Sequence, residues 1–348
     1  MKTCRRIVLC VSLLTLGVSL LTLAALAQDG QQQFASLGDF KLVSGEVIRD
    51  CRMGYRTFGQ LNTAKSNAIL FPTWLGGTSQ ELASSFGPGK LVDTSKYYVV
   101  AVDALGDGVS SSPSNSQLQP HMKFPKFAIK DMVNSERQLL TQVFHITHLK
   151  AVIGISMGGM QTFQWIVSYP DFMDKAIPIV GSPRLGAYDL MLWQAENDAI
   201  MDNAGWNHGD YKENPAKLPL TEFGALMLTT PQRYNQQTTR AQVFETVAKA
   251  KTEPESDAND HIRQTQAMME LDVSDAFGGS MERAAAAVKA KVLIVVSSSD
   301  HMVTPGPARD FGKLLGAQML DLPNDCGHLL SDCENAAIVH TVNDFLTQ

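Results

Sequence analysis

One pentapeptide, Gly154-Ile155-Ser156-Met157-Gly158, constrains the fold of this chain more than any other feature. It follows the apolar run 151–154, which is typical of a buried strand, and it precedes residues 158–168, which have the pattern of a helix. A G-x-S-x-G sequence in this context predicts a sharp turn, where only glycine lets the backbone pass closely enough for the serine hydroxyl to stand clear of the sheet. The alternative is an ordinary glycine-rich turn without chemistry. The flanking strand and helix favour the first interpretation.

Apolar segments alternate with helical ones on both sides of this turn. Such an order indicates a parallel sheet covered by helices on both faces. Together with the serine turn it predicts the α/β class, and within it an α/β-hydrolase fold with a mostly parallel central sheet. The N-terminus through about residue 36 is expected to be polar and loose, and an antiparallel hairpin follows it. The expected strands are 40–47, 51–58, 68–71, 97–102, 151–154, 176–180, 292–296 and 318–322, and the expected helices are 129–143, 158–168, 308–315 and 336–346.

Residues 182–281 break this alternation. They contain helical patterns and Pro and Asn turns but no convincing strand, so we predict a helical lid inserted into a core formed by residues 28–181 and 282–348. Flexible methionines can line an adaptable apolar cleft, although packing between lid helices explains them equally well. The methionines of this segment are Met191, Met201, Met227, Met268, Met269 and Met281. A homodimer formed through the lid is left open.

A serine hydroxyl needs a nearby base to become a nucleophile, and the base needs an acid that orients it. In an α/β-hydrolase fold the acid and the base follow the serine in that order. Asp300 comes directly after the strand 292–296 and its trailing serines, and His328 precedes the last helix, so both fall at the carboxyl ends of strands. We therefore predict a triad of Ser156, His328 and Asp300. Asp321 and Asp325 are the nearest alternatives to Asp300.

The negative charge of a tetrahedral intermediate has to be met by fixed hydrogen-bond donors. The backbone N–H of Met157, at the start of the helix after the serine, is one expected donor. The loop after strand 68–71, Thr73-Trp74-Leu75-Gly76-Gly77, is expected to supply the second, since its glycines allow close approach of the backbone.

The first 27 residues have the features of a signal peptide. Lys2, Arg5 and Arg6 precede the uncharged run 7–26, which ends in the small-x-small sequence Ala25-Leu26-Ala27. We expect cleavage there and export to the periplasm or the medium, with an uncleaved membrane anchor as the alternative. Loss of these residues changes the net charge from −6 to −9. A chain this acidic is not expected to bind nucleic acid.

Cys51, Cys326 and Cys333 remain after cleavage. A zinc site would need more ligands at tighter spacing, and no metal or cofactor is expected. An oxidising compartment permits a disulfide. We predict that Cys326 and Cys333 form one around His328 and that Cys51 stays unpaired; two free thiols are the alternative.

Several segments resemble the homoserine O-acetyltransferase family. The most specific is 154–161 (GISMGGMQ), and the others include 67–80 (NAILFPTWLGGTSQ), 103–114 (DALGDGVSSSPS), 124–140 and 206–211 (WNHGDY). The similarity runs from about residue 40 to the C-terminus. The resemblance implies Ser156, Asp300 and His328 as the triad, and Leu75 and Met157 as the two oxyanion donors.

Two departures from the family pattern concern the amino-acid substrate. Family members have an aspartate directly after the catalytic histidine, which helps to hold the homoserine amine, but Leu329 stands here. They also have a lid arginine that grips the substrate carboxylate, whereas the matching stretch 222–233 has Phe223 near that place. Arg184 and Arg233 are the alternative partners for a carboxylate. A zwitterion needs both charges met in a desolvated pocket, so homoserine is not the expected substrate.

Three functional hypotheses follow from these residues. The leading one is an exported ester hydrolase that works through an acyl-enzyme on Ser156 and takes a small-molecule acyl ester. An O-acyltransferase with a different acceptor uses the same acyl-enzyme and differs in whether the lid excludes water from it. A catalytically silent binding protein on the same scaffold would lack a triad member, and none is missing.

Overall fold

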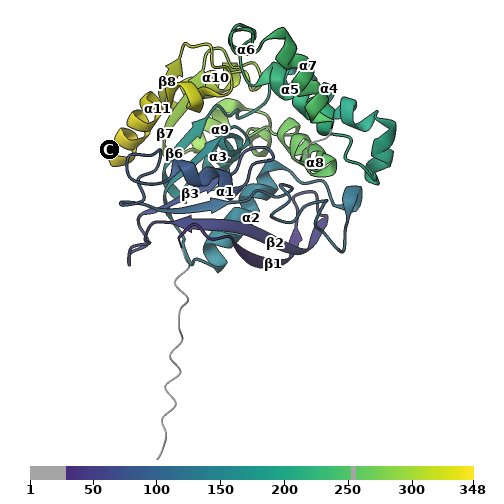
Figure 1. The fold of residues 1–348 in the computed structure, drawn as a ribbon. Helices are drawn as coiled ribbons and strands as arrows, with labels where there is room; N and C mark the ends of the chain where they lie inside the picture. The colour runs from purple at the N-terminus through teal and green to yellow at the C-terminus, as the bar shows by residue number, and fades with distance from the viewer. Residues whose placement is uncertain (1–28, 252–255) are drawn as a thin grey trace, which may run out of the picture.

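Eight strands form one sheet in the computed structural model, which describes residues 29–251 and 256–348. Their order across the sheet is β1-β2-β4-β3-β5-β6-β7-β8 (Figure 1). β2 is antiparallel to both β1 and β4, and all other neighbours are parallel. The predicted α/β class with a mostly parallel sheet is therefore confirmed. The strands are β1 (Gln33–Lys41), β2 (Val47–Phe58), β3 (Ala68–Pro72), β4 (Tyr98–Val102), β5 (Leu149–Ile155), β6 (Met173–Ile179), β7 (Lys291–Ser297) and β8 (Gln318–Leu322).

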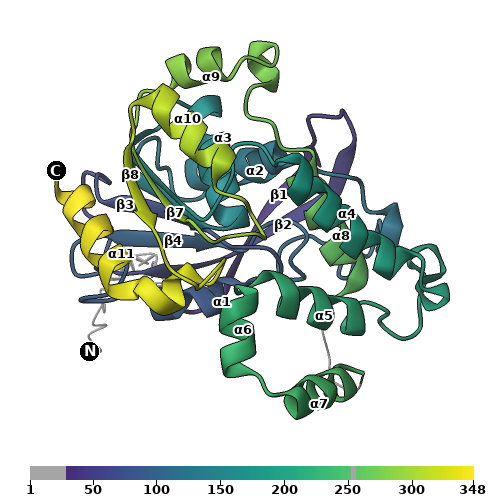
Figure 2. The same cartoon turned by 90° about the horizontal axis from the view of Figure 1, so that it is seen from above.

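The parallel strands bury side chains on both faces, because successive residues of a strand point to opposite sides. In β4, Val100 and Val102 pack on one face and Val99 and Ala101 on the other. Helices α2, α3, α9 and α10 cover the first face, and α1 and α11 cover the second (Figures 1 and 2). These helices are α1 (Ser79–Leu82), α2 (Ile129–Gln142), α3 (Met157–Ser168), α9 (Met281–Ala287), α10 (Gly306–Leu315) and α11 (Leu330–Thr347). Burial on both faces explains why the strand sequences are continuous apolar runs.

Five α-helices occupy the chain between β6 and α9, and the described part of this segment contains no strand. Side-chain caps such as Thr239 before α7 and Asp257 before α8 set where individual helices begin. All five lie within the range 182–281, which we call the insertion; that it acts as a lid stays a prediction. The helices are α4 (Ala187–Met201), α5 (Lys217–Met227), α6 (Pro231–Gln237), α7 (Arg240–Ala250) and α8 (Ala258–Met269).

Several element boundaries differ from the sequence prediction. The expected strand 40–47 is wrong, because residues 42–46 form the turn between β1 and β2. β1 begins at Gln33, which lies opposite Tyr55 of β2, so the expected loose segment is wrong for residues 33–36. Polar residues on its outer face concealed the alternation that buries Ala35 and Leu37. α11 begins at Leu330 rather than at residue 336. The sequence prediction started it too late because its first turns contain weak helix formers and a kink at Glu334.

The predicted signal peptide, residues 1–27, lies outside the described residues. Within 29–251 and 256–348, no helix combines the length and the apolar composition that crossing a membrane requires. Export and the alternative of a membrane anchor stay predictions.

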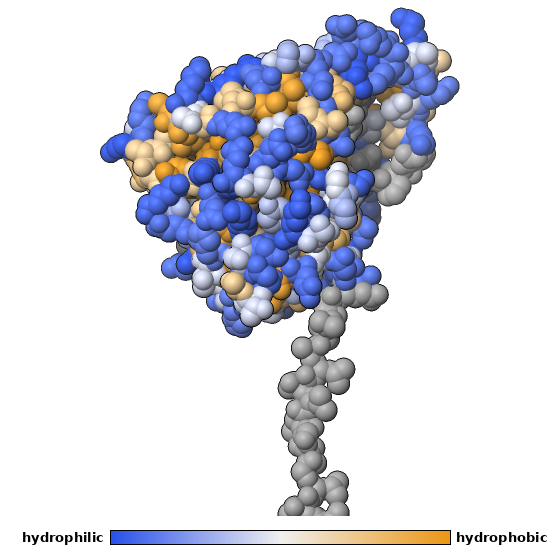
Figure 3. Space-filling view, turned by 90° about the vertical axis from the view of Figure 1, so that its left-hand side faces the viewer, coloured by the Kyte–Doolittle hydropathy of each residue, from blue (hydrophilic) through white to orange (hydrophobic). Residues whose placement is uncertain are grey.

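β8 is an edge strand of the sheet, on the side of the molecule that Figure 3 shows. Apolar residues gather in the upper part of that surface, whereas its lower part is largely hydrophilic. Within β8, Leu320 and Leu322 are only half-buried. Asp321 between them accepts two hydrogen bonds from Arg309, at 2.7 and 2.8 Å. A charged pair on an edge strand disfavours pairing with a second sheet.

Glu136 of α2 is a carboxyl buried in the core. The indole N–H of Trp165 in α3 donates to its Oε2 at 2.6 Å, and its Oε1 has no partner among the described residues. Burial disfavours the charged form and raises the pKa of Glu136 to about 8, against the opposing effect of the Trp165 hydrogen bond. The folded protein therefore holds a proton here that the unfolded chain releases at neutral pH.

We predict that Glu136→Gln removes a pH dependence from the stability. Because the folded pKa is raised, the free energy of unfolding of the wild type falls as pH rises from 4.5 to about 8. Glutamine keeps an acceptor for Trp165 and cannot ionise. Urea unfolding at about pH 5 and about pH 9 should show the variant gaining stability relative to the wild type as pH rises. If the free energies of unfolding of the variant and the wild type differed by the same amount at both pH values, this account would be contradicted.

Candidate active site

Ser156 occupies the turn between β5 and α3 in an uncommon backbone conformation, with φ 57° and ψ −120°. A Cβ atom added to Gly154 would lie 2.1 Å from the carbonyl oxygen of Gly158. One added to Gly158 would lie 2.6 Å from the carbonyl oxygen of Pro72, at the end of β3. Both positions exclude a side chain, which is the physical reason for the G-x-S-x-G spacing. The N–H of Ser156 donates to the carbonyl of Ile179 at 2.8 Å and so ties the strained turn to β6.

The three residues predicted as a triad form a chain of hydrogen bonds. Oγ of Ser156 lies 2.8 Å from Nε2 of His328, and Nδ1 of His328 lies 2.7 Å from Oδ2 of Asp300. Oδ1 of Asp300 accepts the N–H groups of Met302 and Val303 at 2.9 and 3.0 Å. The side chains of Ser156, His328 and Asp300 are all buried. The imidazole is thus held at both nitrogens, in an orientation that lets it accept the serine proton.

The alternative acids lie elsewhere. Asp321 and Asp325 each pair with an arginine, Arg309 and Arg233 respectively. His301 follows Asp300 in the chain, but its Nε2 is hydrogen-bonded to a backbone carbonyl of α5 at 2.9 Å. Of the acidic residues considered from the sequence, Asp300 is the one that the structure brings to His328.

A cavity of about 390 Å³ opens onto Ser156 and His328. The other residues that line it are apolar: Trp74, Leu75, Ile155, Leu228, Met302 and Leu329. The side chains of Trp74, Leu228 and Met302 were not predicted to line the site. Trp74 lies in the loop from which an oxyanion donor is expected, but Leu228 and Met302 come from distant segments. Among the described residues, none that lines this cavity has a permanent charge. The cavity therefore suits an uncharged, partly apolar ligand.

The insertion is hydrogen-bonded to the segment that carries His328. The N–H of Leu329 donates to the carbonyl of Leu228 at 3.1 Å. The hydroxyl of Thr230 donates to the carbonyl of Asp325 at 2.7 Å. These two bonds lie on either side of His328 in the sequence, so the end of α5 helps to fix the position of the imidazole.

Two backbone N–H groups near Ser156, those of Leu75 and of the next residue Met157, have no acceptor in the part of the chain that the structure describes. Met157 is the first residue of α3, where N–H groups lack partners within the helix. Leu75 lies in the loop after β3 and lines the cavity. This loop is tied down at Thr73, whose carbonyl accepts from Nε2 of Gln161 at 3.1 Å. Two donors are thus available where the sequence analysis expected them, and their binding of an oxyanion stays a prediction.

The methionines of the insertion lie away from this cavity. Met191, Met201 and Met269 line a separate groove between α4 and α8, and the other three are buried or half-buried against the core. The methionine at the cavity is Met302, which follows β7. The structure therefore places no methionine-lined cleft of the insertion at Ser156.

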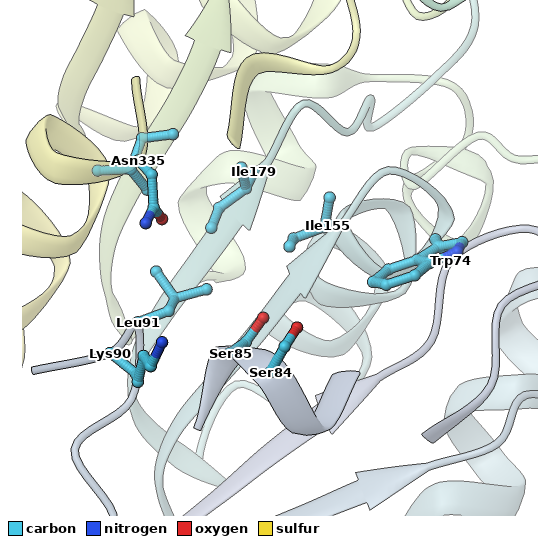
Figure 4. Close-up of a pocket in the computed structure, with 9 residues that line it drawn as sticks. Trp74, Ser84, Ser85, Lys90, Leu91, Ile155, Ile179 and Asn335 are labelled. Carbon is cyan, nitrogen blue, oxygen red and sulfur yellow. The ribbon is translucent and has the colours of Figure 1, made fainter. Parts of the chain in front are cut away.

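A second cavity, of about 280 Å³, adjoins the first. Trp74 and Ile155 line both cavities, so these two side chains stand between them. Figure 4 shows Trp74 at one end of the second cavity and Lys90 and Leu91 at the opposite end. The wall of the second cavity also includes Ile179 and the hydroxyls and amide of Ser84, Ser85 and Asn335. The site thus has an apolar cavity at Ser156 and a partly polar cavity beside it, and the side chains of Trp74 and Ile155 form the partition between the two.

A disulfide joins Cys326 to Cys333 across the segment that contains His328, with Cα atoms 6.2 Å apart. This is the pairing that the sequence analysis predicts. Cys51 is a buried free thiol in β2, and burial raises its pKa to about 12. A thiol with so high a pKa is unreactive at neutral pH.

We predict that peptide mapping of the non-reduced protein recovers Cys326 and Cys333 in one linked species and Cys51 as a thiol. Replacing both paired cysteines by serine should lower the free energy of unfolding by about 2.5 kcal/mol on the chain-entropy estimate for so short a loop. Urea unfolding measures this loss, and Cys51→Ala serves as a control that removes a cysteine without opening the loop. Recovery of Cys326 and Cys333 alkylated without prior reduction would reject the bond.

Comparison with known proteins agrees with this fold. The model of the α/β hydrolase fold family matches residues 69–332. The chain is 31% identical over 316 residues to an ethyl acetate hydrolase of Pseudomonas veronii, which covers 86% of this chain and 90% of that protein. It is 28% identical over 359 residues to a homoserine O-acetyltransferase of Methanococcoides burtonii, which covers 89% of this chain and 72% of that protein.

A solved structure of an acetylester hydrolase from Corynebacterium glutamicum superposes with a TM-score of 0.85 and 29% identity, over 91% of this chain and 96% of that chain. An ester hydrolase and a homoserine O-acetyltransferase are thus each similar to most of this chain. The chain belongs to the α/β-hydrolase fold family, as a homoserine O-acetyltransferase-like member that is a hydrolase or an acyltransferase.

Proposed function

We propose that the protein is an exported ester hydrolase that cleaves small-molecule acyl esters through an acyl-enzyme on Ser156. The observation that carries this proposal is the buried chain of hydrogen bonds from Ser156 through His328 to Asp300, at the wall of an apolar cavity. The hydrolysis of ethyl acetate and acetyl esters by similar proteins supports the class of substrate. The signal-peptide pattern of residues 1–27 supports export.

In the first half-reaction His328 accepts the proton of Ser156 while Oγ attacks the carbonyl carbon of the ester. The tetrahedral intermediate carries a negative oxygen, to which the N–H groups of Leu75 and Met157 donate. As the bond to the alcohol oxygen breaks, His328 gives that oxygen the proton, and the alcohol leaves. Asp300 holds the imidazole in place and stabilises its positive charge. Ser156 now carries the acyl group as an ester.

In the second half-reaction water takes the place of the alcohol. His328 accepts a proton from the water while the oxygen of that water attacks the acyl carbon. The same two N–H groups donate to the negative oxygen that forms. The bond to Oγ of Ser156 then breaks, His328 returns the proton to Oγ, and the carboxylic acid is released. An acyltransferase forms the same acyl-enzyme, with a thiol as the leaving group where acetyl-CoA is the donor, and in this half-reaction an alcohol replaces water.

The cavity wall argues against homoserine as that alcohol. Leu329 lines the cavity at the place where the family that this chain resembles has an aspartate. Arg184 pairs with Asp272 and Arg233 with Asp325, and neither arginine lines the cavity. A zwitterion would bring two charges into a wall that offers no partner for either. Acyl transfer to an uncharged alcohol is the second candidate function, and the similarity to a homoserine O-acetyltransferase favours it.

The purified mature protein should hydrolyse p-nitrophenyl acetate and should not acetylate homoserine with acetyl-CoA. Ser156→Ala should lower turnover by about a million-fold, and a fluorophosphonate probe should label the wild type but not the variant. Circular dichroism serves as the control for folding. Labelling of Ser156→Ala at the wild-type rate would identify another nucleophile. Acetylation of homoserine at an ordinary enzymatic turnover would replace the hydrolase proposal by a transferase.

The partition between the two cavities should limit the length of the acyl chain. In the wild type Trp74 stands between the cavity at Ser156 and the second cavity, so short acyl groups should be preferred. Trp74→Ala would join to it a space of about 280 Å³. We expect the ratio of kcat/KM for p-nitrophenyl octanoate to that for the acetate to rise by roughly tenfold or more, a usual gain for added apolar contact. Trp74→Phe keeps most of the partition and is the control. An unchanged ratio in Trp74→Ala would show that acyl chains extend in another direction.

A further inference from the structure

Gln264 of α8 is a fully buried side chain that no motif singles out. Its Oε1 accepts the backbone N–H of Gly76 at 2.8 Å, and its Nε2 donates to the backbone carbonyl of Leu105 at 3.0 Å. One amide therefore joins a helix of the insertion to two loops of the core, those that follow β3 and β4. The first of these loops carries the free N–H of Leu75.

The hydrogen bonds of this loop decide where the Leu75 N–H points. The carbonyl of Trp74 accepts the N–H of Gly77 at 3.0 Å. In a trans peptide the carbonyl and the N–H that follows it point in opposite directions, so this turn aims the Leu75 N–H away from Gly77. The next N–H, that of Gly76, is held by Gln264. The turn thus has two fixed points, one internal and one supplied by α8.

α8 is a firm support for this contact. A Cβ atom added to Gly106, which has φ 83°, would lie 3.1 Å from Cγ of Gln264, so the helix packs directly on the loop after β4. Asp260 of α8 accepts the N–H of Ser114 at 2.9 Å, and Arg263 donates to a backbone carbonyl ahead of α2 at 2.9 Å. Side chains on successive turns of α8 therefore anchor the helix to the core and hold Gln264 in place.

We propose that Gln264 is a positioning residue for the oxyanion hole, which couples the insertion to the N–H of Leu75. The proposal rests on the proposed function, in which Leu75 donates to the oxyanion. Gln264 does not line the cavity at Ser156, so it acts through the loop. Without its Oε1, the half-buried N–H of Gly76 loses its acceptor, and the loop turns to find another because an unpaired donor that is partly shielded from water is costly. That turn displaces the Leu75 N–H, which acts on the transition state more than on the bound ester.

The test is Gln264→Met, which keeps the length of the side chain and removes both hydrogen bonds. With p-nitrophenyl acetate, kcat should fall by about 10- to 100-fold while KM changes by less than about threefold, because a small displacement of a catalytic group has effects of this size. The affinity for a trifluoromethyl ketone should fall by the same factor, since its adduct with Ser156 presents an oxyanion. A merely structural role would reduce the number of sites titrated by a fluorophosphonate and leave kcat per titrated site unchanged.

Gln266→Met is the matched control, because Gln266 lies on the same helix and bonds to Arg263 rather than to either loop. It should retain the wild-type kcat per titrated site. Gln264→Asn is a second variant in case Gln264→Met folds poorly; its amide is too short to reach both loops, so it should also lower kcat.

Hydrogen exchange at the Gly76 amide is a readout that needs no substrate. Exchange should be faster in Gln264→Met than in the wild type and unchanged in Gln266→Met. If the wild type shows no Ser156-dependent hydrolysis, the proposed function fails. Faster exchange of the Gly76 amide in Gln264→Met would still support the hydrogen bond between α8 and the loop in that case. Unchanged exchange at Gly76, or a wild-type kcat and ketone affinity in Gln264→Met, would overturn the proposal.

Discussion

The backbone contact between Gly154 and Gly158 is the constraint on which the whole site depends. Only glycines allow this approach, beside which Ser156 has a conformation that costs about 1–3 kcal/mol, and the bond from Ser156 to the Ile179 carbonyl helps to hold it there. The remaining components then follow from the direction of the strands. Parallel strands end at one edge of a sheet, so the segments after β3, β7 and β8 bring Leu75, Asp300 and His328 to the edge where β5 presents the serine.

The insertion adds a second layer of support to this edge. The end of α5 is bonded to the segment around His328, and α8 is bonded through Gln264 to the loop of Leu75. The proposed base and one proposed oxyanion donor therefore depend on the insertion as well as on the sheet. A disturbance that separates the insertion from the core would move both components at once, although neither of the anchoring contacts touches the reacting atoms.

The sequence predicts the parts of the site whose signals are local. Ser156 is identified by glycines at fixed spacing, and Asp300 and His328 by their order along the chain and by the strands before them. Leu75 is identified by family resemblance rather than by spacing. Gln264 could not be found in this way, because it bonds to Gly76, 188 positions away in the chain, and a glutamine in a helix usually marks nothing. The cavity walls Trp74, Leu228 and Met302 escape prediction for the same reason, and the polar outer face of β1 hides the start of the sheet.

Buried carboxyls in this protein show why residue type and burial alone do not identify a catalytic acid. Glu136 has one hydrogen bond, from Trp165, and Asp107 has backbone donors on Oδ1 but none among the described residues on Oδ2. Burial raises the pKa of both acids, and the charge of Asp103 raises the pKa of Asp107 further. Asp300 has donors on both oxygens, two backbone N–H groups on Oδ1 and the imidazole on Oδ2. Donors that cover both oxygens replace the water that a carboxylate loses on burial, which suits Asp300 to its proposed role beside a histidine that becomes positively charged.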